Sequence, residues 1–217
     1  MSDFLYPFLE GVAPDVPALL EDLGASAQAK AAVSDALRTE TLEREASSIA
    51  AVADAMASRF SAGGRLFTFG NGGSSTDAAS LAVLFASPPW GEALPARCLA
   101  EDTAVLSALG NDVGFELVFA RQLIAHARAG DIALGLSTSG GSRNLLAAFR
   151  EARRSDILTV GFAGYDGGEM ARSDDVNHCL VVRSDSIHRI QETHGALAVA
   201  LWSAIHDRLT PAEAAHA

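Results

Sequence analysis

Short apolar runs alternate with longer stretches of helical composition over most of the chain. Five of these runs are continuous in apolar character, as expected of strands that are buried on both faces. They lie at residues 65–69, 96–99, 131–136, 157–162 and 179–182. Strands that alternate with helices form a parallel sheet covered by helices on both sides. The pattern therefore predicts an α/β fold, a three-layer αβα sandwich around a five-stranded parallel sheet.

The N-terminal part follows a different pattern. Prolines at positions 7, 14 and 17 interrupt residues 1–30, which predicts no long helix there. Residues 28–60 are rich in Ala, Glu, Leu and Arg and favour one long helix, or two in succession. We therefore expect an N-terminal helical extension over residues 1–30 that contains no long helix, one domain over residues 31–210 and a loose tail over residues 211–217.

Charge and composition exclude several classes of function. The net charge of −11 arises from 27 acidic and 16 basic side chains, and such a surface repels a phosphate backbone. No apolar run approaches the roughly 20 residues needed to span a bilayer. The first residues, Met1 to Phe4, lack the basic region of a signal peptide. We therefore expect a cytoplasmic protein that binds neither nucleic acid nor membrane directly.

Two turns after predicted strands have unusual compositions. The first, residues 70–74 (GNGGS), has three glycines in four positions, so its backbone can approach a ligand closely. Ser74 and Asp77 have the spacing of a capping box, which predicts that a helix begins there. By itself, this turn fits a structural role as well as a binding role. In a parallel sheet, however, ligands bind beyond the carboxyl ends of the strands.

The second turn, residues 137–142 (STSGGS), lies between a predicted strand and a predicted helix. Its four hydroxyls and consecutive N–H groups suit a tetrahedral anion, and the helix dipole adds positive potential. A Ser/Thr-capped turn is the simpler alternative, but the composition favours a phosphomonoester. A dinucleotide-binding oxidoreductase is disfavoured by the glycine spacing and by the lack of an acidic residue after the second strand.

Five segments, in one collinear order over about residues 28–210, resemble the sugar isomerase (SIS) domain. They are GNGGSSTDA (70–78), GNDVGFELVFARQ (110–122), LSTSGGSRN (136–144), GYDGGEMA (164–171) and RIQETH (189–194). The branch they resemble is sedoheptulose 7-phosphate isomerase, or phosphoheptose isomerase, which also contains the non-enzymatic DnaA-initiator-associating proteins. Members of this family are homotetramers with sites at subunit interfaces. The resemblance thus implies the SIS fold, a phosphorylated sugar as ligand and a homo-oligomer, tetramer or dimer.

The resemblance also assigns roles to individual residues. Four hydroxyl side chains of the second turn would bind the phosphate: Ser137, Thr138, Ser139 and Ser142. Residues from three other segments would contact the sugar: Asn71, Gly72, Gly73, Asn111, Asp112 and Gln191.

The positions that the resemblance assigns to metal binding and proton transfer have changed. The family pattern has a His and a Glu four residues apart on the first helix, where both reach one metal ion. It has a further His eight residues after the Gln of RIQE. This chain keeps Gln191 but has Ser80, Leu84 and Val199 at the other three positions. We therefore expect no zinc or other cofactor, and neither the base nor the acid of the family.

Two hypotheses about function follow. The first is a protein that binds a ketose phosphate with little or no turnover, and that passes this state to a protein partner or through its oligomer. The second is an active phosphoheptose isomerase with a relocated acid–base pair, for which His188 and His194 are the candidates. The losses at Leu84 and Val199 favour the first hypothesis.

Overall fold

The computed structural model describes residues 16–210, and the chain divides into two compact units, residues 1–36 and residues 37–217. Helix α1 (Val16–Arg44) accounts for all described residues of the first unit. The prediction that prolines exclude a long helix before residue 30 is wrong for residues 16–30. Pro17 lies in the first helical turn, where the N–H that proline lacks has no intrahelical partner to lose. Pro7, Pro14 and the predicted tail over residues 211–217 lie outside the described residues.

The described part of the first unit carries exposed apolar side chains in a regular spacing. Val16, Leu19, Leu20 and Leu23 are each about half exposed or more. Their spacing of three and four residues places them on one face of α1.

The second unit is built on a five-stranded parallel sheet, as predicted. Its strands are β1 (Leu66–Gly70), β2 (Ala96–Cys98), β3 (Ile132–Ser137), β4 (Leu158–Gly164) and β5 (His178–Val182). The spatial order is β2-β1-β3-β4-β5, and all neighbours are parallel. Strands β1, β3 and β4 are buried along their whole length, which explains their continuous apolar sequences.

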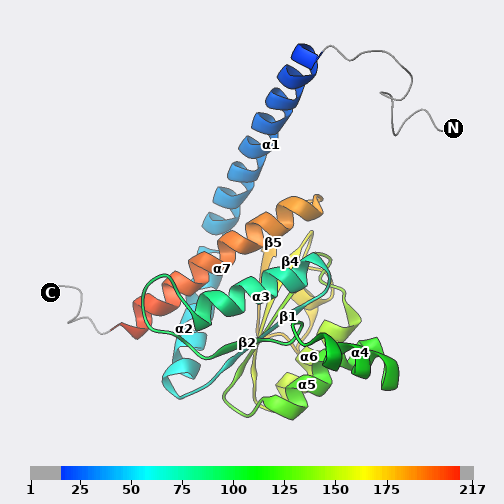
Figure 1. Cartoon of the computed structure of the whole chain (residues 1–217). Coiled ribbons are helices and arrows are strands. Elements are labelled where there is room, and N and C mark those ends of the chain that lie inside the picture. The colour runs from blue at the N-terminus through cyan, green and yellow to red at the C-terminus, as the bar shows by residue number, and fades with distance from the viewer. Residues whose placement is uncertain (1–15, 211–217) are drawn as a thin grey trace. The chain divides into compact units, whose positions relative to one another are not determined.

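Helices follow the strands in alternation and complete the three layers (Figure 1). They are α2 (Ala46–Ser61), α3 (Gly73–Ala86), α4 (Thr103–Asp112), α5 (Val118–His126), α6 (Arg143–Arg154) and α7 (Ile187–Leu209), with short 3-10 helices at Phe115–Leu117 and Met170–Arg172. The capping-box prediction is wrong, because the N-cap of α3 is Gly72, two residues before Ser74, and it makes no side-chain cap.

Alternate strand residues separate the core into two clusters. Leu134 and its neighbours of the same pleat pack with buried residues of α2, α3 and α7. Phe69 and Ala133, which face the other way, pack with buried residues of α5 and α6. The sheet is thus covered by α2, α3 and α7 on one face and by α5 and α6 on the other.

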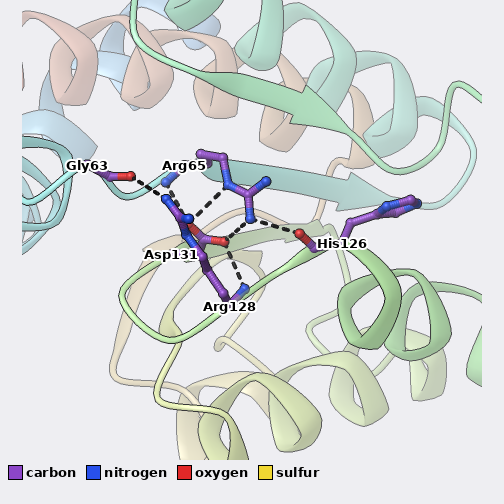
Figure 2. Close-up of polar contacts among 5 residues, drawn as sticks. All are labelled: Gly63, Arg65, His126, Arg128 and Asp131. Atoms are coloured by element: carbon purple, nitrogen blue, oxygen red, sulfur yellow. Dashed lines mark hydrogen bonds and ion pairs between the residues drawn. The ribbon is translucent and has the colours of Figure 1, made fainter.

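A buried carboxylate stabilises the amino edge of the sheet. Asp131, directly before β3, has 0% exposure and accepts hydrogen bonds from the Arg65 backbone N–H and guanidinium and from the Arg128 backbone N–H (Figure 2). The Arg65 guanidinium also donates to the His126 carbonyl at 2.8 Å. Asp131 therefore joins the segment before β1 to the segment before β3 through bonds that use both carboxylate oxygens.

No helix in the described residues 16–210 is both long enough and apolar enough to span a membrane.

Candidate functional site

The two unusual turns meet at the point where the strand order reverses. Strand β1 is followed by β2 on one side, while β3 lies on its other side. In sheets with this order, the carboxyl ends of the first and third strands flank the crevice where ligands bind. Gly70, the last residue of β1, lies in register with Leu136, next to the last residue of β3. The glycine turn and the serine turn are therefore neighbours at the carboxyl edge.

The serine turn gathers its hydroxyls closely. Ser137 Oγ lies 3.1 Å from Ser142 Oγ and 3.5 Å from Ser139 Oγ. The backbone N–H of Gly140 donates to Ser137 Oγ at 3.1 Å. Ser142 is the N-cap of α6 but makes no side-chain bond to the helix, so its hydroxyl remains available beside the positive end of the helix. This arrangement could offer several neutral donors to one anion, and the phosphate site itself stays a prediction.

A second loop holds the serine turn in place. The Gly164 N–H donates to the Thr138 carbonyl at 3.0 Å, and the Met170 N–H donates to the Gly140 carbonyl at 2.8 Å. Gly140 has a φ of +62°, and a Cβ there would clash with the Gly167 carbonyl. The segment GYDGGEMA, one of the five that resemble the SIS domain, thus fixes the backbone of the serine turn through these hydrogen bonds.

The glycine turn is tied to two helices. Asn71 and Asn144 exchange two side-chain hydrogen bonds, at 2.8 and 2.9 Å, which join this turn to the start of α6. Gln191, on α7, lies against Gly73 so closely that a Cβ on Gly73 would clash with its amide. Its Nε2 donates to Asp77 on α3 at 3.4 Å. Burial raises the pKa of Asp77, and this hydrogen bond partly offsets the effect.

A pocket of about 300 Å³ lies between α3 and α7. Its lining residues are Asp77, Ser80, Leu81, Leu84, Leu136, His194, Gly195, Ala198 and Val199. Leu136 directly precedes the serine turn, so the pocket adjoins the predicted phosphate site. The three changed positions, Ser80, Leu84 and Val199, all lie in this lining.

His194 forms part of the pocket wall and is fully buried. Neither of its ring nitrogens has a hydrogen-bond partner of good geometry among the described residues. Its ring lies 5.9 Å from that of Phe162, centre to centre. Burial lowers the pKa of His194 to about 4, an effect that the Ala163 backbone opposes in part. The imidazole is therefore neutral at pH 7.

The other predicted site residues are more dispersed. Asn111 and Asp112 are exposed at the end of α4, where the Asn111 amide donates to the Asp112 carboxylate at 2.8 Å. His188 is exposed near the start of α7 and is not part of the pocket between α3 and α7. Their predicted roles stay predictions.

Sequence reasoning assigned no role to Arg143. This exposed cation begins α6 and lines a hollow of about 300 Å³ together with Asn71, Phe115, Glu116, Ser142 and Asn144. A basic residue in the first turn of a helix opposes the helix dipole, and that was the available signal for a binding role.

The residues of the pocket do not fit the metal site of the SIS pattern. Asp77 and His194 are the two side chains in its lining with strong metal-binding groups, and leucine and valine have none. In the described part of the chain, no three His, Cys, Asp or Glu side chains group as metal ligands do. The expectation of no zinc stays a prediction that the donor set favours.

Comparisons with known proteins agree with this geometry. Residues 31–164 match the SIS domain family. A phosphoheptose isomerase of Roseiflexus sp. is 44% identical over 160 residues, which cover 73% of this chain and 80% of the relative. The structure of a phosphoheptose isomerase from Neisseria gonorrhoeae superposes with a TM-score of 0.79 at 33% identity and covers 85% of this chain and 99% of its own. One from Francisella tularensis gives 0.74 at 31% identity and covers 90% and 100%. The chain therefore belongs to the SIS domain family and resembles the phosphoheptose isomerases within it.

Proposed function

We propose that this protein binds a phosphorylated sugar, a ketose phosphate, at the carboxyl edge of its sheet and turns it over slowly or not at all. The observation that carries the proposal is the contrast within one site. The serine turn keeps four hydroxyls and a helix N-terminus for a phosphate, while the adjoining pocket has leucine and valine at two of the positions where the family pattern has metal ligands. Such a site keeps the groups that bind phosphate and lacks, at Leu84 and Val199, the groups that transfer protons in the family pattern.

The family relationship supports the ligand class. The relatives in the comparison are named phosphoheptose isomerases, and the chain spans most of the length of each. We therefore take sedoheptulose 7-phosphate as the first ligand to test.

The alternative is an active isomerase that uses His188 or His194. His194 lies in the pocket, which favours it over His188 as an acid–base group. Its pKa of about 4 makes it a weak base at pH 7, and this argues against rapid enolisation.

We also propose a homo-oligomer, tetramer or dimer, in the cytoplasm. The apolar face of α1 formed by Val16, Leu19, Leu20 and Leu23 supports it, because exposed apolar patches on proteins mark association surfaces. The same proposal includes a protein partner that binds the ligand-bound state of this protein.

Phosphorus NMR of the purified protein with sedoheptulose 7-phosphate, with and without zinc, tests the proposal. We expect a broadened or shifted ketose phosphate signal and no new aldose phosphate signal. Ser142→Ala should weaken the effect, and Ser58→Ala, an exposed serine near the end of α2 at the amino edge of the sheet, should not. New aldose phosphate signals that scale with protein concentration would establish the active isomerase instead.

The triple variant Ser80→His, Leu84→Glu, Val199→His examines the lost metal site directly. We expect it to bind zinc, because these changes restore the residue types of the family pattern around Gln191. Gain of isomerase activity would show that these three changes account for its loss. A variant that binds zinc without activity would show that the sugar contacts have diverged as well.

A further inference from the structure

We propose that the pocket between α3 and α7 receives a deoxygenated, methyl-bearing end of the phosphorylated ligand, and that His194 hydrogen-bonds an uncharged oxygen beside that end. This inference rests on the proposed function, since it names the chemical class of ligand for the same site. It makes one prediction that a site for a fully hydroxylated sugar does not make: the protein should bind the deoxy compound more tightly.

The pocket changes in polarity along its length. Helices α3 and α7 lie side by side, and both begin at the carboxyl edge (Figure 1). Asp77, which bonds Gln191, lies in the first turns of α3, whereas Leu84 lies two turns further on. Ala198 and Val199 lie similarly far along α7. Apart from Leu136, the lining is therefore more polar near the two binding turns and apolar away from them.

This change in polarity indicates which end of a ligand would enter the apolar part of the pocket. A phosphate held on Ser137 and Ser142 leaves the opposite end of the molecule to extend along the helices toward Leu84 and Val199. A hydroxyl at that end would find no hydrogen-bond partner on leucine, alanine or valine. A methyl group there gains from contact with these apolar side chains.

His194 adds a second, independent indication that the pocket has a ligand. Neither nitrogen of this buried imidazole has a partner of good geometry among the described residues, which is unusual because buried polar groups nearly always have one. The neutral ring has one N–H donor and one acceptor nitrogen. A carbonyl or hydroxyl oxygen of the ligand would supply a hydrogen-bond partner to this ring. A metal cation would find few donor groups, because most of the lining has no metal-binding atoms.

The lack of a side chain at Gly195 leaves space in the wall of the pocket. It lies within α7, lines the pocket and has no atom within 4 Å of an added Cβ. Glycine in a helix interior lowers stability relative to alanine. The position thus keeps free space beside His194 at the expense of helix stability.

Titration calorimetry with sedoheptulose 7-phosphate and its 1-deoxy analogue tests the inference, because the two differ by the hydroxyl furthest from the phosphate. We expect the analogue to bind at least about tenfold more tightly, as apolar pockets discriminate by factors of about 10 to 100. The double variant Leu84→Gln, Val199→Thr should lose this preference. Val83→Thr, an exposed residue of α3 outside the pocket, is the matched control and should keep it.

The outcomes separate the inference from the proposed function. Equal affinities in the unaltered protein, with both weakened by Ser142→Ala, overturn the inference and leave phosphosugar binding in place. Binding of neither compound overturns both. Equal affinities together with a smaller oligomer for Val199→Thr in sedimentation velocity overturn the inference too, and assign the pocket to a second copy of the chain. His194→Leu should weaken binding of the analogue several-fold without loss of folding, and an unchanged affinity would contradict the role of His194.

Discussion

The two edges of the sheet differ in how completely their buried polar side chains are hydrogen-bonded. At the amino edge, Asp131 accepts hydrogen bonds at both carboxylate oxygens from Arg65 and Arg128 (Figure 2). At the carboxyl edge, His194 is equally buried and has no partner of good geometry among the described residues. Full hydrogen bonding at the amino edge is typical of a structural role, whereas the unused bonding capacity at the carboxyl edge fits the ligand site proposed above.

Removal of the carboxylate at the amino edge should have the largest effect. Asp131→Ala leaves the backbone N–H groups of Arg65 and Arg128 without an acceptor and the Arg65 guanidinium without its anion. We expect the free energy of unfolding to fall by about 3 kcal/mol, at the low end for a buried pair because Arg65 is partly exposed. Urea unfolding followed by circular dichroism measures this change.

Asp54→Ala is the control for that experiment. Asp54 also pairs with an arginine, Arg208, but its side chain is 69% exposed. An exposed pair contributes well under about 1 kcal/mol. If both variants lose the same stability, the amino edge has no special role and the comparison between the edges fails.

Protonation of His194, at the carboxyl edge, should lower the stability of the protein in acid. Its folded-state pKa of about 4 lies below the unfolded value of 6.5, so the unfolded chain binds one more proton between these values. Stability from this group is complete above pH 6.5 and is lost as the pH falls toward 4, by about 3 kcal/mol in total. Unfolding free energies measured from pH 7 to pH 4 should show this slope.

His194→Leu should remove that slope and also stabilise the protein at pH 7. The substitution replaces a buried polar group without partners by an apolar one, which favours the folded state by about 1 kcal/mol or more. Asp77 lines the same pocket, and burial raises its pKa. Its contribution to the pH dependence of stability has the opposite sign to that of His194 and remains in the variant. An unchanged pH profile in His194→Leu would mean that His194 has a partner in solution.

The smallest effect is expected at Gly195. Alanine fits there without contact, and the helix gains about 0.5–1 kcal/mol from the loss of glycine. Thermal unfolding should therefore shift upward, while affinity for the deoxy ligand should fall as the pocket narrows. Gly24→Ala, also in a helix and also without atoms near an added Cβ, should show the gain in stability alone.

Much of the fold followed from local signals. The buried strands β1, β3 and β4 were recognisable because a strand covered on both faces is apolar at every position. The helix at residues 16–30 was missed because Pro17 was taken as an interruption, although its place in the first turn allows it. The capping box at Ser74 was wrong because Gly72, with a positive φ that favours glycine, is the N-cap, and Ser74 already lies inside α3.

The candidate site was predicted in part. Its serine and glycine turns were found from their composition, and their adjacency followed from the rule for parallel sheets. The Asn71–Asn144 pair and the backing of the serine turn by Met170 and Gly164 were not found, because these contacts join residues distant in sequence and carry no local pattern.

The sequence by itself determined which chemical groups this protein has: hydroxyls and glycines after two strands, and Leu84 and Val199 where the family pattern has metal ligands. Only the tertiary structure decided how those groups are used. It brought Leu84 and Val199 from two helices into one pocket. It buried His194 there with no well-placed partner among residues 16–210, while Asp131 received several. The physical reason is that composition is local, whereas burial and hydrogen-bond partnership depend on which distant segments pack together.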